Sequence, residues 1–329
     1  MTSGEDKLIA RFFKPLATHP GALALTDDTA VFEPPMGHDL VLTADAVTGG
    51  VHFFPDDPAG AIARKALRVN LSDLAAKGAK PLGFLMTLAL PPSIDDAWLD
   101  KFAAGLGADA EAFACPLFGG DTIRTPGPVS VSIFAFGSVP NGRMVKRHGA
   151  EPGDRILVTG TIGDAALGLR LRKDAGAAQE WNLDAAMRDH LAGRYLLPEP
   201  RMQIAEALRT HASAAMDVSD GLAGDLSKLC GVSGVSAKID AASVPLSAAA
   251  KRALAADRAL IEPILTGGDD YEIVCTMRPD NVAAFRALAA KAQLAVTEIG
   301  SVIDGTDAPR FIDANGAALA FARTSFSHF

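Results

Sequence analysis

The stretch Ala214-Ala215-Met216-Asp217-Val218-Ser219-Asp220-Gly221-Leu222 is an apolar segment that ends in two carboxylates and a hydroxyl and then leads into a helix. Ligand groups in α/β proteins lie where strands end and helices begin. A simpler interpretation makes Ser219 or Asp220 a helix N-cap, but this leaves Asp217 unexplained. We therefore expect an α/β domain that binds a ligand at this strand end.

Five further acidic motifs are spread along the chain, most of them beside small residues or glycines. They are Asp27-Asp28, Thr43-Ala44-Asp45, Asn70-Leu71-Ser72-Asp73, Gly119-Gly120-Asp121 and Gly267-Gly268-Asp269-Asp270. The sequence has no G-x-x-x-x-G-K-[ST] loop and no G-x-G-x-x-G motif after a predicted strand. Carboxylates alone would repel a nucleotide, so the pattern indicates phosphates held through Mg²⁺.

Each motif also has an ordinary structural explanation when it is taken alone. Gly119-Gly120-Asp121 ends a predicted strand and could be a tight turn. Asn70 and Asp73 share one face of a predicted helix, which is either a ligand face or a solvated stripe. A lone histidine such as His52 is more often structural, and the charge run around Arg147 is either a solvated surface or a phosphate clamp. The order of the motifs together, rather than any one of them, indicates function.

Length and composition indicate the number of domains and the class of protein that carries these motifs. The 329 residues suggest about two domains, and 49% apolar with 21% charged residues is typical of a globular enzyme. The net charge of −8 argues against nucleic acid or an anionic membrane surface as the main partner. The longest apolar stretch, around residues 83–90, is far shorter than a membrane span.

The cysteines and the N-terminus indicate a cytoplasmic protein. Cys115, Cys230 and Cys275 are too few and too scattered for a disulfide framework or a zinc site, and we expect them to be buried apolar residues. Glu5, Asp6 and Lys7 precede any apolar run, so the N-terminus is not expected to be a signal peptide.

Hydrophobic periodicity predicts alternating helices and strands on both sides of a turn-rich connector at residues 148–154. The predicted helices cover residues 8–16, 57–77, 94–113, 163–175, 183–194 and 199–210. The predicted strands cover residues 39–45, 82–90, 117–121, 129–139, 155–159 and 214–218. We place the domain boundary at the connector, giving domains 1–148 and 149–329, and expect a surface loop within residues 175–190.

The order of these motifs resembles the thiamine-monophosphate kinases of the aminoimidazole-ribonucleotide synthetase-like superfamily. The resemblance runs from Gly4-Glu5, with Leu8-Ile9-Ala10-Arg11, to the terminal His328-Phe329. It implies an α/β (α+β) fold with two domains. The N-terminal domain, residues 1–148, would bind ATP and Mg²⁺ and pair its sheet with that of a second copy in a homodimer. The C-terminal α/β domain, residues 149–329, would complete the active site.

The resemblance also implies a reaction, in which ATP and thiamine monophosphate give thiamine diphosphate and ADP. The phosphoryl group would pass directly between substrates, so no residue is expected to act as a covalent nucleophile. Several Mg²⁺ ions would be bound, with the ligands Asp28, Thr43, Ala44, Asp45, Asp73, Asp121, Asp217 and Asp220. ATP would contact Gly120, Asp121, Arg147 and Ser219. Thiamine monophosphate would contact His52, Asp269 and Phe326.

The chain departs from the usual family pattern in several places. Ala24 and Thr26 replace two glycines before Asp27-Asp28, which restricts the backbone of that loop. Ala44 stands where a threonine is common and could offer a metal only its carbonyl. Asp269 replaces a usual glutamate and reaches one methylene less far. Arg323 stands where the family can have an aromatic residue that stacks on the thiamine ring, and Phe326 replaces a common Trp or Tyr. Recognition of that ring is therefore less well specified than the metal ligands.

Other functions of the superfamily fit the sequence less well. Selenophosphate synthetases carry a reactive cysteine or selenocysteine in a glycine-rich N-terminal segment, whereas the first cysteine here is Cys115. The hydrogenase-maturation member ends in a functional cysteine, whereas this chain ends in His328-Phe329. Aminoimidazole-ribonucleotide synthetase lacks this set of motifs but stays the alternative within the superfamily. A regulator that binds the nucleotide without turnover is the alternative from another class of protein.

Overall fold

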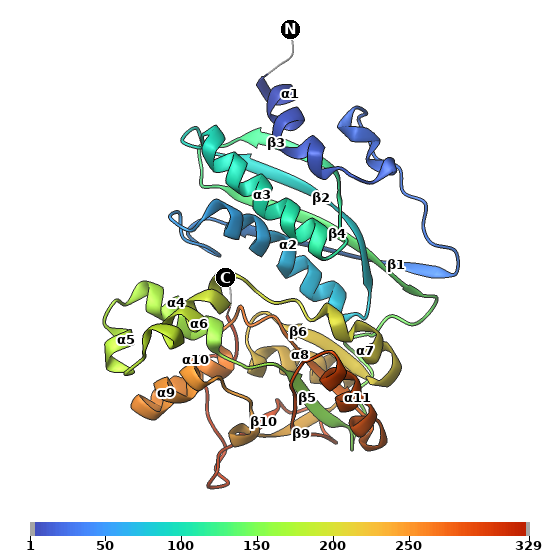
Figure 1. Cartoon of the computed structure of the whole chain (residues 1–329). Coiled ribbons are helices and arrows are strands. Elements are labelled where there is room, and N and C mark those ends of the chain that lie inside the picture. Colours follow the sequence, from blue (N-terminus) through green and yellow to red (C-terminus); the bar gives the residue numbers. More distant parts are fainter. Residues whose placement is uncertain (1–3, 327–329) are drawn as a thin grey trace. The chain divides into compact units, whose positions relative to one another are not determined.

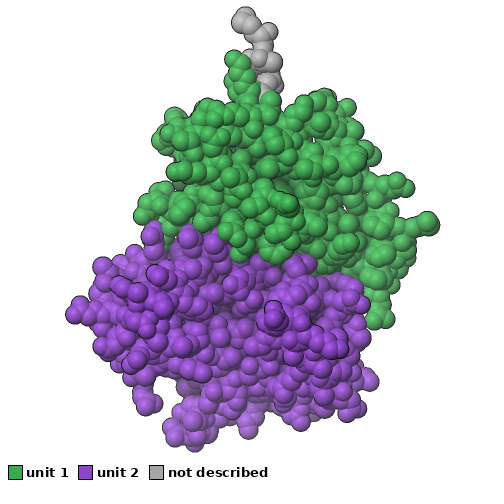
Figure 2. Space-filling model, viewed as in Figure 1, with its two compact units in different colours: residues 1–74, 79–144 green, residues 75–78, 145–329 purple. Residues whose placement is uncertain are grey.

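The computed structural model describes residues 4–326 and divides into two units (Figures 1 and 2). Unit 1 comprises residues 1–74 and 79–144, and unit 2 comprises residues 75–78 and 145–329. The domain boundary predicted after residue 148 lies a few residues inside unit 2. The terminal pair His328-Phe329 lies outside the described residues.

Unit 1 is built on a four-stranded sheet of order β1-β4-β2-β3, in which only the β2–β3 pair is parallel. The strands are β1 (His38–Thr48), β2 (Lys80–Leu90), β3 (Leu117–Arg124) and β4 (Ser130–Pro140). The helical elements are α1 (Gly4–Leu8), η1 (Ile9–Phe13), η2 (Lys14–Leu16), η3 (Pro20–Leu25), α2 (Ala59–Ala76) and α3 (Asp96–Ala112). These elements confirm the predicted helices and strands of this region, with bounds that differ by a few residues.

Helices α2 and α3 cover one face of this sheet (Figure 1). Side chains alternate between the two faces of a strand, and those that point toward the helices are buried, as Phe84 and Leu88 on β2 are. The other face carries large apolar side chains that remain exposed. They are Leu40, Leu42, Leu85, Ile123 and Phe134. The sheet of unit 1 is therefore apolar on both faces, and the helices bury only one.

Unit 2 is built on a six-stranded sheet of order β10-β7-β9-β5-β8-β6. The strands are β5 (Arg155–Thr159), β6 (Ala214–Val218), β7 (Ser236–Asp240), β8 (Glu272–Met277), β9 (Val296–Ile303) and β10 (Arg310–Ile312). The helices are α4 (Asp164–Lys173), α5 (Ala177–Glu180), α6 (Ala185–Leu196), α7 (Ala205–His211), α8 (Leu222–Ser233), α9 (Ala248–Ala256), α10 (Ile261–Thr266) and α11 (Pro279–Lys291). The short 3₁₀ turns are η4 (Met202–Ile204), η5 (Ala241–Ser243) and η6 (Arg258–Leu260).

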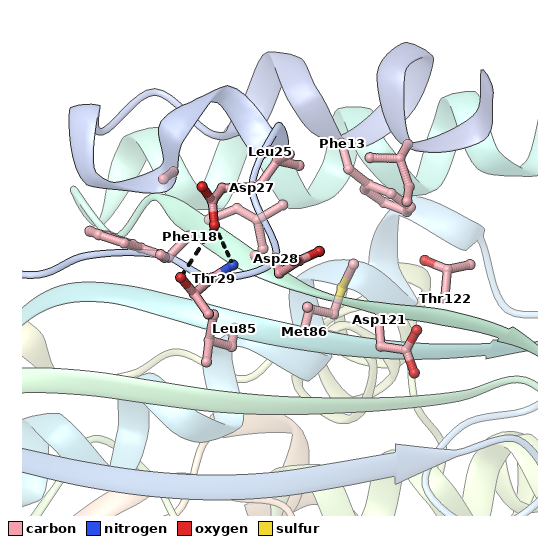
Figure 3. Close-up of a pocket in the computed structure, with 16 residues that line it drawn as sticks. Phe13, Leu25, Asp27, Asp28, Thr29, Leu85, Met86, Phe118, Asp121 and Thr122 are labelled. Atoms are coloured by element: carbon pink, nitrogen blue, oxygen red, sulfur yellow. Dashed lines mark hydrogen bonds between the residues drawn. The ribbon is translucent and has the colours of Figure 1, made fainter. Parts of the chain in front are cut away.

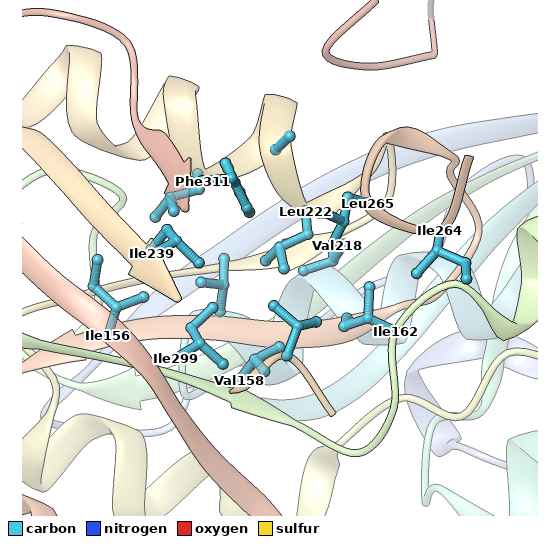
Figure 4. Close-up of a cluster of buried hydrophobic side chains, with 14 of the residues drawn as sticks. Ile156, Val158, Ile162, Val218, Leu222, Ile239, Ile264, Leu265, Ile299 and Phe311 are labelled. Atoms are coloured by element: carbon cyan, nitrogen blue, oxygen red, sulfur yellow. The ribbon is translucent and has the colours of Figure 1, made fainter. Parts of the chain in front are cut away.

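Both faces of the second sheet are buried, because helices cover each of them. Ile156 and Val158 of β5 join a core that α4, α8, α9 and α10 complete (Figure 4). Leu157, between them in the sequence, points to a second core built with α7 and α11. Strands that are buried on both faces have continuous apolar sequences, which explains why β5 and β6 could be predicted. All three cysteines are free and buried, as predicted.

The prediction of a surface loop within residues 175–190 is wrong. The segment forms α5 and the start of α6, and Trp181 between them is only 1% exposed. The guanidinium of Arg170 lies 5.5 Å from the centre of the Trp181 ring. Burying so large a ring stabilises a segment whose composition alone resembles a loop.

No helix within residues 4–326 is both long enough and apolar enough to cross a membrane.

A buried carboxylate and a histidine link α4 to α6 in unit 2. His190 Nε2 lies 2.9 Å from Asp164 Oδ2, and the same carboxylate accepts hydrogen bonds from Thr161 and Ser247. Burial raises the pKa of Asp164, but its hydrogen bonds outweigh burial and leave the pKa below its ordinary value. The hydrogen bond to Asp164 raises the pKa of His190 against the opposing effect of burial.

This pair predicts a pH dependence of stability. A raised folded-state pKa means that His190 stabilises fully below its unfolded pKa of about 6.5 and loses this contribution as the pH rises through the folded value. The contribution of Asp164 is lost only in acid, as the pH falls through its lowered pKa. We expect the thermal unfolding midpoint to fall between about pH 6 and pH 8, and His190→Gln to lose that part of the slope.

The size of this effect is limited because the His190 side chain is 43% exposed, so we expect less than about 1 kcal/mol. His38→Gln is the matched control, since His38 is exposed and bonds only to a nearby backbone carbonyl. An unchanged slope in His190→Gln would contradict the assignment.

Candidate active site

Unit 1 contains a cavity of about 540 Å³ that brings together two acidic motifs far apart in the sequence (Figure 3). The loop with Asp27 and Asp28 forms one wall, and Gly119-Gly120-Asp121-Thr122 of β3 forms another. Apolar side chains, including Phe13 and Met86, complete the lining. A cavity of this size, lined by acidic segments and by apolar side chains, suits a small organic ligand that carries a charged group.

Gly120 shapes the wall of this cavity on β3. Its φ angle is +149°, and a Cβ atom added there would lie 1.8 Å from the carbonyl oxygen of Met86. No other residue fits without moving β2, so this position requires glycine. The close approach at Gly120 is to the neighbouring strand β2. The prediction that Gly119-Gly120-Asp121 ends a strand is wrong, because β3 continues to Arg124.

The loop before Asp27 keeps an unusual backbone path without the glycines that the family pattern has. Leu23, Ala24 and Leu25 all have φ near +50°, a conformation that costs an L-residue roughly 1 kcal/mol. Thr26 has φ of −113° and needs no glycine. Ala24, which replaces one family glycine, is therefore strained, whereas Thr26, which replaces the other, is not.

A second group of predicted ligands lies where β1 meets α2. The Thr43 hydroxyl donates to the carboxylate of Asp73, and the backbone N–H of Asp45 donates to Asn70 Oδ1 at 3.1 Å. Asn70 in turn donates from Nδ2 to the carbonyl oxygen of Ala66 at 3.0 Å. Asn70 is fully buried, so this face of α2 is not a solvated stripe. Asn70 fixes the strand that carries Asp45.

The strand register separates Asp121 from Asp45. Asp45 is paired with Ile133 on β4, on the face that the helices cover. Asp121 pairs with Thr87, which pairs with Ser132, on the opposite face. In Figure 3 the Asp121 carboxylate accordingly points away from Asp28. In residues 4–326 no cluster of three His, Cys, Asp or Glu side chains forms a closed metal site.

His52 lies in the turn that follows β1. Its Nδ1 atom accepts a hydrogen bond from the backbone N–H of Thr48 at 3.1 Å, which leaves the proton on Nε2. Lys65 of α2 donates to the carbonyl oxygen of His52 at 2.9 Å and is 1% exposed. A buried ammonium therefore holds this turn in place.

In unit 2, the predicted strand–turn–helix at Asp217–Leu222 is confirmed as the end of β6, a turn and the start of α8. Asp217 is 6% exposed, and Asp220 follows in the turn. The ammonium of Lys228 lies 2.5 Å from Asp220 Oδ2 and 2.8 Å from Asp225 Oδ1. Burial raises the pKa of Asp225, and Lys228 offsets this only in part.

The predicted substrate residues of unit 2 lie against the same turn. The backbone N–H of Asp269 donates to the carbonyl oxygen of Ser219 at 2.8 Å, and that of Phe326 donates to Asp220 at 2.9 Å. The structure therefore brings together Ser219, Asp220, Asp269 and Phe326 from three separate parts of the chain. Arg147 is exposed on the segment before β5.

The chemistry of these groups fits Mg²⁺. Hard divalent cations prefer carboxylate, hydroxyl and carbonyl oxygens, which are the donors of both units. At Asp220 the Lys228 ammonium lies against the carboxylate and would have to give way to a bound ion. The side chains could therefore hold Mg²⁺, although the described residues form no complete coordination shell.

Sequence reasoning missed several supporting residues. Lys65, Asp225 and Lys228 fix the predicted ligands but belong to none of the motifs examined as sites. The sequence does contain a signal for them, because each is a charged residue in a helix that otherwise buries an apolar face. A charge that is buried there requires a partner, which marks it as a residue that supports another.

Comparison with known proteins assigns the family. Residues 26–139 match the N-terminal domain, and residues 151–311 the C-terminal domain, of AIR synthase related protein. The thiamine-monophosphate kinase of Caulobacter vibrioides is 44% identical, over 90% of this chain and 83% of that protein.

Two solved structures agree with this assignment. Thiamine-monophosphate kinase from Stenotrophomonas maltophilia K279a has a TM-score of 0.82 at 38% identity, covering 95% of this chain and 96% of that one. AaThiL complexed with AMPPCP and TMP has a TM-score of 0.76 at 31% identity, covering 92% of this chain and 91% of that one. The chain therefore belongs to the AIR synthase related family and, within it, to the thiamine-monophosphate kinases.

Proposed function

We propose that this protein phosphorylates thiamine monophosphate with ATP, giving thiamine diphosphate and ADP. The family supports this reaction, and so does the solved relative that holds AMPPCP and TMP. The observation that carries the proposal is the cavity of unit 1, which the Asp27-Asp28 loop and the Gly119-Gly120-Asp121 segment both line from distant parts of the chain. These are the motifs from which the resemblance expects nucleotide and metal contacts.

The residues present suit direct transfer between the two substrates. Phosphoryl transfer depends on in-line positioning and charge neutralisation, so it needs no nucleophilic side chain. The three cysteines are buried, and burial raises the pKa of Cys115 and Cys275 to about 12. The thiolate is the nucleophilic form of cysteine, so these buried, protonated thiols are poorly suited to nucleophilic attack. Bound Mg²⁺ would supply the positive charge that brings two phosphate groups together.

We assign the Mg²⁺ ligands within each unit separately. In unit 1 they are Asp28, Thr43, the carbonyl of Ala44, Asp45, Asp73 and Asp121, and in unit 2 they are Asp217 and Asp220. Gly120, Asp121, Arg147 and Ser219 would contact ATP. His52, Asp269 and Phe326 would contact thiamine monophosphate. Free, buried thiols at all three cysteines fit a reducing compartment, so we place the reaction in the cytoplasm.

We further propose a homodimer in which the exposed sheet face of unit 1 meets the same face of a second copy. Leu42, Leu85 and Phe134 share this face, because Ala44 pairs with Phe134 and Phe134 pairs with Leu85. Leu42 is 57% exposed and Phe134 is 39% exposed. Apolar patches of this kind on a sheet commonly mark protein interfaces.

The reaction can be tested with purified protein, ATP, Mg²⁺ and thiamine monophosphate, followed by chromatographic separation of the thiamine species. We expect thiamine diphosphate and ADP in equal amounts. Binding of ATP in the presence of Mg²⁺ with no diphosphate formed would favour a silent nucleotide-binding regulator instead.

Removal of a proposed metal ligand should abolish transfer. We expect Asp45→Ala and Asp121→Ala each to lower kcat/KM by at least about 10²-fold, because phosphate charge would be left uncompensated. Direct Mn²⁺ binding, followed by electron paramagnetic resonance, should weaken in both variants. Asp100→Ala is the control, since Asp100 is an exposed partner of Arg11 whose ion pair contributes little. Near wild-type turnover in either ligand variant would remove that residue from the metal site.

The proposed dimer can be tested by placing a charge on the sheet face. We expect Leu42→Asp or Phe134→Asp to shift the protein from dimer to monomer in sedimentation velocity, because a buried unpaired carboxylate is costly. Val232→Asp is the matched control, since Val232 is also 57% exposed but lies on α8 in unit 2. A monomeric wild type, or a dimer that persists in both variants, would exclude this face.

A further inference from the structure

The loop from Gly267 to Tyr271 has a strained backbone on both sides of Asp270. Asp269 has φ of +74° and Tyr271 has φ of +51°, although neither is glycine. Each such conformation costs an L-residue of the order of 1 kcal/mol and persists only where surrounding contacts impose it. Backbone strain of this kind is a reason to look for function in the loop.

Backbone contacts press the loop onto the turn that follows β6. The N–H groups of Asp269 and Tyr271 donate to the carbonyl oxygens of Ser219 and Val218, each at 2.8 Å. A Cβ atom at Gly268 would lie 2.5 Å from the Ser219 carbonyl oxygen, so the approach requires glycine. The loop is thus fixed against the turn that carries the proposed metal and ATP groups of unit 2.

Asp270 supplies the anchor on the other side of the loop. Its side chain is 1% exposed and accepts from the backbone N–H of Gly163 at 2.8 Å and of Ala165 at 3.4 Å, at the start of α4. Arg194 of α6 donates to the Asp270 carbonyl oxygen at 3.0 Å and to Glu272 at 2.9 Å. Side chain and backbone of Asp270 are therefore both tied to helices that do not carry the proposed site.

We propose that Asp270 is a positioning residue, which holds the neighbouring Asp269 in the left-handed conformation required to contact thiamine monophosphate. The inference rests on the proposed function, since it assigns Asp269 to that substrate. Asp270 itself is buried beneath the loop and touches no substrate. Its effect on the reaction passes through the backbone of Asp269.

A positioning role and a purely structural role can be distinguished by the kinetic constant that each of them changes. Loss of the anchor lets Asp269 relax out of its strained conformation, so affinity for the thiamine substrate should fall. The proposed ATP contacts Gly120 and Asp121 lie in unit 1 and do not depend on this loop, whereas Ser219 of unit 2 receives a hydrogen bond from Asp269 at its backbone carbonyl oxygen and keeps its side chain free of that bond. We therefore expect a rise in KM for thiamine monophosphate with little change in KM for ATP or in kcat.

The test compares Asp270→Ala, Asp270→Ser and Asp270→Asn with the wild type in steady-state assays that vary each substrate in turn. In the alanine and serine variants we expect KM for thiamine monophosphate to rise roughly tenfold, with kcat and KM for ATP within about threefold. Burial raises the pKa of Asp270 well above its ordinary value, so neutral asparagine is a close substitute. Asp270→Asn should accordingly restore most of the affinity. Serine provides a second short side chain should the alanine variant fail to fold.

Asp154→Asn is the matched control. Asp154 is also buried in unit 2, but its hydrogen-bond donors, the Ser213 hydroxyl and the Glu151 backbone N–H, lie outside the loop and outside the start of α4. It should lower the unfolding midpoint without changing KM for thiamine monophosphate.

Three results would overturn the inference. KM for thiamine monophosphate in Asp270→Ser could stay within about twofold of the wild type, both KM values could rise together, or Asp154→Asn could raise the same KM equally. In each of these cases a wild type that forms thiamine diphosphate leaves the proposed function intact. A wild type that forms none would remove the proposed function and the positioning role together.

Discussion

Mutual repulsion among carboxylates is the constraint on which the rest of this structure depends. A protein that gathers acidic side chains for a cation must stabilise them before the cation arrives. Each unit does so with its own donors. In unit 1 the Thr43 hydroxyl donates to Asp73, and in unit 2 the ammonium of Lys228 lies between Asp220 and Asp225. These donors offset the repulsion between neighbouring carboxylates in the folded protein. They explain why Asp73, Asp225 and Lys228 are polar although each lies on a helix that packs against the core.

The same constraint explains why backbone geometry is unusual near the proposed ligands. Phosphate groups and metals are bound closely only where the backbone can approach them, and side chains must not intervene. Gly120 removes a side chain that would overlap β2. Elsewhere the chain accepts strain instead, as at Ala24 and Asp269, where residues with a Cβ adopt positive φ. Within residues 4–326, five of these strained positions lie in the two loops that carry Asp28 and Asp269. The other three, Ala114, Asn182 and Gln293, lie elsewhere.

The sequence was sufficient to predict what depends on short-range pattern. The strand–turn–helix at Asp217–Leu222 was predictable because an apolar run followed by polar residues and glycine encodes it locally. The register that puts Asp121 and Asp45 on opposite faces was not, because strand pairing depends on partners distant in the sequence. Trp181 shows the same limit, since only tertiary packing distinguishes its segment from a loop.

The residues that hold the site in place are harder to predict from the sequence than the residues that bind its ligands, and the reason is physical. A ligand residue such as Asp220 belongs to a compact motif, because several groups must converge on one small molecule. A supporting residue only needs one partner, so Asp225 and Lys228 can lie anywhere that the fold brings within hydrogen-bond reach. What distinguishes them is burial of a charged or polar group, which costs several kcal/mol unless it is paired. Lys65 and Asp270 meet this criterion, and both hold a loop that carries a proposed substrate residue. Buried, paired charges beneath loops are therefore the natural place to look for residues that tune the site without touching its ligands.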